Sequence, residues 1–209
     1  MPTPIYHITH IDNLTPILNS GGLIANIRLR RERINYLDIA YESIQDRRAR
    51  TSVPCGAGGV LHDYVPFYFA PRSPMLCAIH NGKVKGYEQG QEPVVHLVST
   101  AETVNATDLS FAFTDGHAVM AYADFYNELG YLDEVIDWEL MKSKYWFDTP
   151  DDPNRKCRRQ AEFLVHQFCP WRLITEIGVI NSTIQAQVQR ILQNVNYQTP
   201  VRVYPNWYY

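Results

Sequence analysis

The sequence predicts a mixed α+β fold built on one largely antiparallel sheet. Predicted strands and helices follow one another without the regular strand–helix–strand order of a doubly wound parallel sheet. The chain has 209 residues, enough for one domain with a sizeable core and too few for two comfortable ones. Hydrophobic residues make up 45% and charged residues 20%, which is typical of a globular protein. We therefore expect a single domain over residues 1–209.

The first half of the chain predicts three strands and one helix. Residues 4–11 are apolar and β-branched, which indicates a short strand. A helix is expected over 11–22, where paired glycines end it. Its apolar residues share one face: Ile11, Leu14, Ile17 and Leu18. Further strands are expected at 64–71 and 93–100.

The second half adds two helices and three short strands. A helix is predicted over 116–130, ended by Gly130. Residues 143–160 form a polar segment broken by prolines, which indicates a loop. The remaining predictions are strands in 161–168, 175–180 and 200–209 and a helix over 183–195.

Several classes of protein are disfavoured by composition and motif. The net charge of −3 gives no overall basic signature, so any nucleic-acid affinity must come from local patches. The chain has neither a charged and apolar leader nor an apolar run near 18 residues, which favours a soluble, cytoplasmic protein away from membranes. Neither the four cysteines nor the seven histidines have metal-ligand spacing, so no metal is expected. Walker A, Rossmann and G-x-S-x-G patterns are missing from the sequence.

Basic residues gather in two segments. Residues 28–50 hold seven arginines against four acids, a local charge of +3, and residues 155–159 read RKCRR. Of the 19 basic residues 14 are arginine, which favours forked contacts to phosphate and stacking on bases. Two solvated faces explain the same pattern about equally well. The alternative is a strand of nucleic acid lying across a groove.

Two predicted strands carry candidates for chemistry. His7 and Thr9 share one face of the first strand, although a lone strand histidine is more often a core residue. Glu162 opens an apolar strand, where most acids are solvated edge residues. Burying such a carboxylate is costly without hydrogen bonds, so it belongs at a strand end or in a cleft. In a cleft, it suits a reaction in which positive charge develops at a sugar carbon.

Several motifs together resemble the DarT family of DNA ADP-ribosyltransferase toxins, a branch of the ADP-ribosyltransferase superfamily. They run in order through nearly the whole chain: YHIT (6–9), IDNL (11–14), IQDRRAR (44–50), LHDYVPFYFAPRSPML (61–76), HNGKV (80–84), FTDGHA (113–118) and AEFLV (161–165). The 61–76 segment is the most distinctive of them. The resemblance implies a single-domain ADP-ribosyltransferase-like fold with a split, largely antiparallel sheet flanked by helices.

The resemblance implies an activity and a set of site residues. The family transfers ADP-ribose from NAD to a thymine base in single-stranded DNA within short sequence contexts. Glu162 matches the catalytic glutamate, and Arg47, with Arg48 next, the catalytic arginine. The residues implied in binding NAD are His7, Ile8, Thr9, Asn13, Arg47, Tyr68 and Phe69; for the last two, a role as plain core aromatics is about as well supported.

The resemblance also implies contacts and partners. The residues expected to face the DNA are Arg48, Arg50, Arg72, Met75, Arg155, Lys156, Arg158 and Arg159. The last four lie where the superfamily has its substrate-recognition loop. A DarG-like macrodomain antitoxin that removes the modification is implied as a partner.

Two alternatives stay open from the sequence. The same site could modify another base, RNA or protein, which competition between substrates would reveal. A different class is a module that binds single-stranded nucleic acid without catalysis. That module would never consume NAD, and its affinity for nucleic acid would not depend on Glu162.

Overall fold

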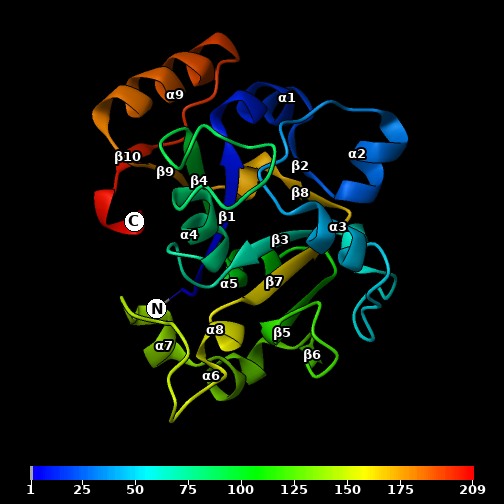
Figure 1. Cartoon of the computed structure of the whole chain (residues 1–209). Coiled ribbons are helices and arrows are strands. Elements are labelled where there is room, and N and C mark those ends of the chain that lie inside the picture. The colour runs from blue at the N-terminus through cyan, green and yellow to red at the C-terminus, as the bar shows by residue number, and fades with distance from the viewer. Residues whose placement is uncertain (1) are drawn as a thin grey trace.

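The computed structural model describes residues 2–209; Met1, the first residue of the expected domain, lies outside them. Eight strands form one sheet in the order β10-β9-β4-β1-β3-β7-β5-β6 (Figure 1). All neighbouring pairs in it are antiparallel except β9 with β10. Two short strands, β2 and β8, pair separately. The mixed, largely antiparallel architecture predicted from the sequence is therefore confirmed.

The elements have the following bounds. The strands are β1 Pro4–His10, β2 Gly22–Ile24, β3 Tyr64–Tyr68, β4 Val94–Thr100, β5 Phe111–His117, β6 Phe125–Tyr126, β7 Ala161–His166, β8 Phe168–Pro170, β9 Glu176–Val179 and β10 Val201–Val203. The helices are α1 Leu14–Asn19, α2 Asn26–Glu32, α3 Glu42–Arg48, α4 Pro74–His80, α5 Ala101–Asn105, α6 Leu132–Val135, α7 Trp138–Lys142, α8 Arg155–Arg158 and α9 Ser182–Asn194. Short 3-10 turns follow β1, precede β3, and occur at Leu129–Tyr131, Trp171–Leu173 and Pro205–Trp207.

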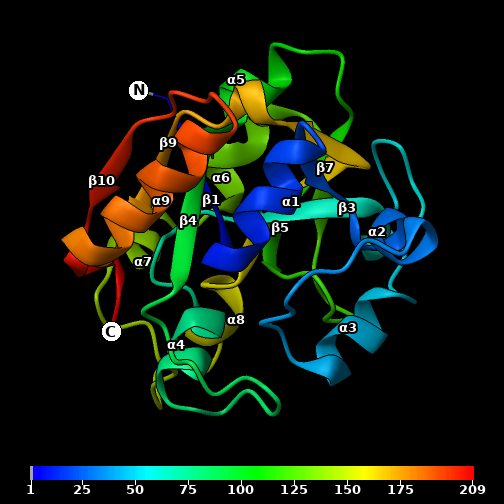
Figure 2. The ribbon, with the colours of Figure 1, turned by 90° about the horizontal axis from the view of Figure 1, so that it is seen from above.

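The sheet is split between β1 and β3. All seven residues of β1 pair with β4, whereas β1 meets β3 through one pair, Tyr6 with Tyr68. Figure 2 shows the consequence, since β3 runs across the direction of β4. Strands that diverge leave backbone groups on their facing edges without a neighbouring strand. The split therefore opens a space in the middle of the sheet.

The core explains why these segments form strands and a long helix. Side chains such as Ile5, Phe67 and Phe163 are fully buried, each at an alternating position of its strand. On α9, Ile184, Val188 and Leu192 recur every fourth residue and form its buried face. The side chain of Asn181 caps this helix by accepting a hydrogen bond from the Ile184 amide. The predicted helix over 183–195 is confirmed within one residue.

The helix predicted over 116–130 is wrong. Strand β5 continues to His117, and a turn then leads into β6. Apolar spacing after Gly116 imitates a helical face, but β5 gains paired backbone along β7 instead. Gly116 also lets α8 approach closely, because a Cβ there would meet the Cys157 sulfur at 3.1 Å. Tertiary packing overrides the local helical pattern. The expected loop over 143–160 is likewise interrupted, by α8.

Within residues 2–209, none of the helices is long and apolar enough to cross a membrane.

Three histidines, of which His62 and His96 are buried and His7 is half-buried, make stability depend on pH. Burial lowers the pKa of His7, His62 and His96 from 6.5 to about 4. In the unfolded chain these three imidazoles bind protons below about pH 6.5. In the folded chain they bind them only near pH 4. The stability these neutral imidazoles contribute is thus complete above pH 6.5 and is lost as the pH falls toward 4. At about pH 5 the fully buried His96 alone should cost roughly 2 kcal/mol of unfolding free energy.

Urea unfolding at about pH 7.5 and pH 5 measures this dependence. His96 contacts the Pro71 carbonyl at 3.0 Å and the Tyr208 hydroxyl at 3.2 Å, so His96→Gln keeps polar atoms there without a titrating ring. The variant should lose less stability between the two pH values than the wild-type protein, by roughly 2 kcal/mol. An equal loss in both proteins would mean that His96 is not the group that titrates.

Candidate active site

A cavity of about 200 Å³ lies at the split of the sheet. Its walls come from β1, β3, α3, the start of α4 and the 34–40 segment that follows α2. Of the residues expected to bind a cofactor or DNA, seven line it: His7, Ile8, Thr9, Asn13, Arg48, Tyr68 and Met75. The structure thus brings together residues that lie up to 68 positions apart in the chain.

His7 is held as a neutral hydrogen-bonding group at the floor of the cavity. Its Nδ1 lies 2.8 Å from the Pro66 carbonyl oxygen on β3. A carbonyl only accepts, so Nδ1 carries the proton and Nε2 is an acceptor. Burial lowers the pKa of this imidazole to about 4, although the bond to Pro66 acts in the opposite direction. His7 therefore bridges the split while keeping one acceptor nitrogen.

Asn13 fixes the 34–40 segment to the end of β1. Its Oδ1 accepts from the Leu37 amide at 2.7 Å, and its Nδ2 donates to the Leu37 carbonyl at 2.9 Å. The same Nδ2 donates to the Thr9 hydroxyl at 3.0 Å. Both Thr9 and Asn13 are buried. Their polar groups are thus used to hold the cavity wall.

Glu162 is buried beside the cavity, at the start of β7. It pairs with Tyr68 across the strands, and its amide donates to the Thr114 hydroxyl at 3.1 Å. Only 4% of the residue is exposed. The guanidinium of Arg48 donates from Nη1 to both carboxylate oxygens, at 3.0 and 2.7 Å. This pairing supplies the hydrogen bonds that a buried carboxylate needs.

The charge of Glu162 is set by two opposing effects. Burial raises the pKa of the carboxyl, but the charge of Arg48 and the nearby His117 outweigh it and leave the pKa below its usual value. Glu162 is therefore ionised at neutral pH. An anion confined beside an open cavity can stabilise positive charge that develops in a bound molecule.

His117 is a site residue that the sequence analysis missed. The strand pairing of β5 with β7 shifts register between Phe113 and His117, and this irregularity turns His117 toward the glutamate. Its Nδ1 lies 3.7 Å from Glu162 Oε1 and has no hydrogen-bond partner among residues 2–209. The incorrect prediction of a helix over 116–130 placed His117 in a helix and not at the end of a strand, so it was not considered a site residue. The signal was the short apolar run FAFT in 111–114, which is typical of a buried strand immediately before it.

Arg47 and Arg48 occupy different sides of α3. Successive helical residues are turned by about 100°. Arg48 is buried on Glu162, whereas Arg47 is exposed and donates to the Val119 carbonyl at 2.8 Å. The structure thus brings Arg48 to the carboxylate and leaves Arg47 away from it, the reverse of the preference given above. Nη2 of Arg48 is buried without a partner among residues 2–209.

Tyr68 and Phe69 also face opposite ways, because side chains alternate along a strand. Tyr68 lines the cavity, and burial, followed by the negative charge of Glu162, raises the pKa of its hydroxyl. Phe69 lies in the core, edge-on to Trp138 and Phe163. The structure places Phe69 away from the cavity, in the core position that was the alternative for it.

The basic residues near Glu162 are largely engaged with the protein itself. Arg159 is buried and donates to the carbonyls of Arg72, Leu140, Met141 and Ser143. Arg158 pairs with Asp152 at 2.6 Å and with Asp137 at 3.1 Å. Both guanidinium groups are thus bound by groups of the protein, and a DNA contact for either one stays a prediction. Lys156 and Arg50 are exposed, as a phosphate contact requires.

The remaining two residues expected to contact DNA, Arg155 and Arg72, differ in how the protein engages their guanidinium groups. Arg155 donates to the Tyr145 carbonyl at 2.9 Å. Arg72 lies 4.2 Å from the centre of the Tyr209 ring, and its Nε is buried without a partner among residues 2–209. In the same described range, no three His, Cys, Asp or Glu side chains gather as a metal site would require.

Comparisons with a family model and with known proteins all match this chain to DNA ADP-ribosyltransferases. The family model described as "DarT: ssDNA thymidine ADP-ribosyltransferase" matches residues 6–209. A DNA ADP-ribosyl transferase of Thermus sp. (strain 2.9) is 48% identical, over 100% of this chain and 97% of the relative. A DNA ADP-ribosyl transferase-DNA ADP-ribosyl glycohydrolase fusion protein of Thermosipho africanus is 27% identical, over 92% of this chain and 46% of its own length.

Solved structures agree with the fold. Thermus sp. 2.9 DarT in complex with ADP-ribosylated ssDNA superposes with a TM-score of 0.92 at 47% identity, covering 100% of this chain and 97% of that chain. The same protein in complex with NAD+ gives a TM-score of 0.89 at 44% identity, covering 100% and 98%. With the family model matching almost the whole length, the chain belongs to the DarT family of ssDNA thymidine ADP-ribosyltransferases.

Proposed function

We propose that this chain transfers ADP-ribose from NAD to a thymine base in single-stranded DNA and releases nicotinamide. The observation that carries the proposal is Glu162, ionised and held by Arg48 beside the cavity at the split. The Thermus sp. relative binds NAD+ and ADP-ribosylated ssDNA with a closely similar fold, which supports both substrates here. Residues 1–209 would then act as one catalytic domain.

The reaction exchanges one glycosidic bond for another. The bond from the ribose C1′ to the nicotinamide nitrogen breaks, and nicotinamide leaves neutral with the electron pair. A bond then forms from C1′ to the thymine ring nitrogen that pairs in a duplex, and the proton of that nitrogen is released. Between the two events C1′ carries positive charge. Glu162 stabilises that charge and accepts a hydrogen bond from a ribose hydroxyl.

Arg48 takes the role for which Arg47 was preferred from the sequence. Its Nη1 orients the carboxylate of Glu162. Its second terminal nitrogen, Nη2, is buried without a protein partner among residues 2–209, and a substrate atom in the cavity that Arg48 lines would supply that partner. A guanidinium remains charged, so hydrogen bonding to the thymine edge favours the deprotonated base. His7 and Tyr68 then form walls of the NAD site.

Activity should depend strongly on an unpaired thymine. Mass spectrometry of oligonucleotides incubated with the protein and NAD should show one added ADP-ribose on thymine-containing single strands. A blunt duplex should react weakly, because exposing a paired base costs a few kcal/mol. A thymine-free strand is the control. Equal rates on single and double strands would contradict the proposal, and modification of the thymine-free strand would move the acceptor to another base.

Other acceptors are separated in the same experiment. RNA and protein are added in competition with the DNA strand, and each is checked for added ADP-ribose. Preferential labelling of RNA or protein would replace DNA as the substrate. NAD left intact with every acceptor would favour the non-catalytic binding module.

Asn13 is expected to govern NAD affinity more than turnover. Asn13→Asp keeps the acceptor for the Leu37 amide but loses the donor to the Leu37 carbonyl and to Thr9. Two lost hydrogen bonds should loosen the 34–40 wall and raise KM for NAD by roughly tenfold, with kcat changed much less. Steady-state kinetics with varied NAD measures both. A fall in kcat at unchanged KM would instead place Asn13 in the chemical step.

A hydrolase that removes the modification is the partner we propose. The Thermosipho africanus relative joins a DNA ADP-ribosyl transferase to a DNA ADP-ribosyl glycohydrolase in one chain. By analogy, a separate DarG-like macrodomain protein would act as antitoxin to this chain. Because both NAD and chromosomal DNA are cytoplasmic in bacteria, we also infer a cytoplasmic site of action.

A further inference from the structure

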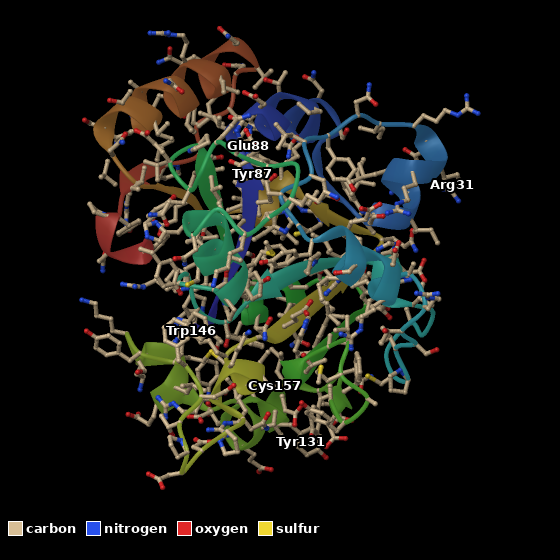
Figure 3. The ribbon with its side chains drawn as sticks, viewed as in Figure 1. Arg31, Tyr87, Glu88, Tyr131, Trp146 and Cys157 are labelled. Atoms are coloured by element: carbon tan, nitrogen blue, oxygen red, sulfur yellow. The ribbon has the colours of Figure 1, made fainter. Side chains whose placement is uncertain are left out.

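The side chain of Tyr209 joins segments that lie far apart in the chain. Its hydroxyl accepts a hydrogen bond at 2.8 Å from the indole of Trp146, which Figure 3 shows beside α7. The same hydroxyl lies 3.0 Å from the Arg72 carbonyl oxygen and 3.3 Å from the Ser73 carbonyl oxygen. Carbonyls only accept, and a hydroxyl has a single proton. The proton of the Tyr209 hydroxyl is therefore shared between the carbonyls of residues 71–73, which we call the 71–73 segment.

Tyr209 is itself fixed through its backbone and its ring. Its amide donates to the Gln91 side-chain oxygen at 3.0 Å, and the Gln91 side-chain nitrogen donates to the Tyr209 backbone oxygen. The Arg72 guanidinium lies over the ring, 4.2 Å from its centre, where a cation is attracted to the π-face. A hydroxyl carried on a ring that is held in this way defines the position of the backbone that it contacts.

The 71–73 segment is held by donors that lie outside it. On β4, His96 donates from Nε2 to the Pro71 carbonyl at 3.0 Å. The Arg72 carbonyl accepts from Nε and Nη2 of Arg159 at 3.3 and 3.2 Å, in addition to the Tyr209 hydroxyl. Because its carbonyls are the accepting groups, the path of the segment is set by side chains from other parts of the fold.

The 71–73 segment joins two residues that line the cavity, Tyr68 at the end of β3 and Met75 in the first turn of α4. Ser73 is buried between them, and its side chain caps α4 by accepting from the Leu76 amide at 3.1 Å. Burial raises the pKa of the Tyr68 hydroxyl, and a hydrogen bond to the Ser73 side chain acts in the opposite direction. A displacement of the segment would therefore move both of these cavity walls.

We infer that Tyr209 is a positioning residue for NAD: it holds the 71–73 segment, and through it Tyr68 and Met75, in the arrangement that binds the dinucleotide. The inference rests on the proposed function, of which it uses only the binding of NAD. Tyr209 does not line the cavity, so it acts without touching NAD. A wall that is fixed in advance leaves less ordering to be done when the ligand binds.

Tyr209→Phe tests the hydroxyl, because it keeps the ring beneath Arg72 and removes the bonds to the carbonyls. Isothermal titration calorimetry with NAD, without DNA, gives Kd. The variant should raise Kd on the order of fivefold, the factor that one net hydrogen bond represents. In steady-state kinetics KM for NAD should rise with kcat changed much less, a split that a plain loss of stability would not produce. An unchanged Kd would overturn the inference.

Tyr204→Phe is the matched control. It removes a hydroxyl from the same part of the chain, one that donates to the Glu176 carboxylate at 3.3 Å. The ring of Tyr204 stacks on Trp207 and lies outside the cavity lining. Kd for NAD should stay at the wild-type value. An equal rise of Kd in Tyr204→Phe and Tyr209→Phe would mean that the contact with the 71–73 segment is not the cause, and the inference would fail.

Trp146→Phe separates the two sides of the Tyr209 hydroxyl. It removes the indole donor but leaves the hydroxyl bonded to the carbonyls of the 71–73 segment. Kd for NAD should therefore remain close to the wild-type value. A rise as large as that in Tyr209→Phe would show that the hydroxyl acts through Trp146, and the role assigned to the 71–73 segment would be wrong.

The test separates failure of the positioning role from failure of the proposed function. Transfer of ADP-ribose to thymine is followed with the wild-type protein in parallel. If transfer occurs and Tyr209→Phe binds NAD as tightly as the wild-type protein, the positioning role alone fails. If the wild-type protein binds NAD but transfers nothing to thymine, the proposed function fails, and Kd in Tyr209→Phe still decides the positioning role. If the wild-type protein does not bind NAD, both fail.

Discussion

Glu162→Gln is expected to lower the turnover of thymine modification by roughly 10³-fold. The amide has nearly the shape of the carboxylate and still accepts a hydrogen bond from Arg48, but it carries no negative charge. Positive charge that develops at C1′ as nicotinamide leaves would then lose its buried counter-charge. Initial rates at saturating NAD and oligonucleotide, followed by mass spectrometry, measure kcat directly.

A second glutamate provides a matched control. Glu176 opens β9, pairs with Arg202 at 3.2 Å, and lies outside the cavity lining. Glu176→Gln should therefore keep the wild-type turnover. Kd for the oligonucleotide should remain close to the wild-type value in Glu162→Gln, because the change removes charge and not a DNA contact. A Glu162→Gln protein with near-normal kcat would falsify the assignment of the carboxylate.

The elements that were predictable from the sequence are those whose pattern is local. Strands β1, β3, β4 and β7 carry runs of apolar and β-branched residues, and α9 repeats its apolar residues every fourth position. Glu162 was identifiable because a carboxylate next to such an apolar run is costly to bury without hydrogen bonds. The family motifs then gave it a chemical role.

Other parts of the site depend on contacts that no local pattern records. The turn of His117 toward Glu162 depends on a register shift between β5 and β7. The burial of Arg159 depends on carbonyls from two distant segments. A sequence shows how many cations a segment has, but not which of them the fold uses. For that reason the sequence did not distinguish Arg158 and Arg159, which bind groups of the protein, from the exposed Lys156.

The two adjacent arginines illustrate the same limit. Both belong to the same motif, and a turn of about 100° decides which one faces inward. Helix α3 was not predicted, so its phase could not be assigned. The structure buries Arg48 and exposes Arg47. Because of this difference, a substitution of Arg48 can be compared with the same substitution of Arg47 as its control.

Arg48→Met is expected to impair both activity and stability, whereas Arg47→Met should change either one little. Without the guanidinium, Glu162 would remain buried without the cation beside it, and His117 Nδ1 lies 3.7 Å from its Oε1. Removing one member of a buried ion pair costs about 3 kcal/mol or more. Turnover should fall by at least about 10²-fold, because the carboxylate loses its orientation and part of its charge. Urea unfolding and oligonucleotide kinetics measure the two effects.

The pH dependence of that stability loss tests its cause. In the wild-type protein Arg48 keeps the pKa of Glu162 below its usual value, so the pair stabilises the fold above that usual value and loses its contribution as the pH falls through the lowered pKa. In Arg48→Met, burial acts with little opposition and raises the pKa of Glu162. The variant should therefore be most destabilised at neutral pH and progressively less so toward about pH 5, where the carboxyl becomes protonated. Adding Glu162→Gln to Arg48→Met should recover part of the stability at neutral pH, though none of the turnover. If the destabilisation is equal at all pH values, Arg48→Met destabilises the protein through lost packing and not through an unpaired carboxylate.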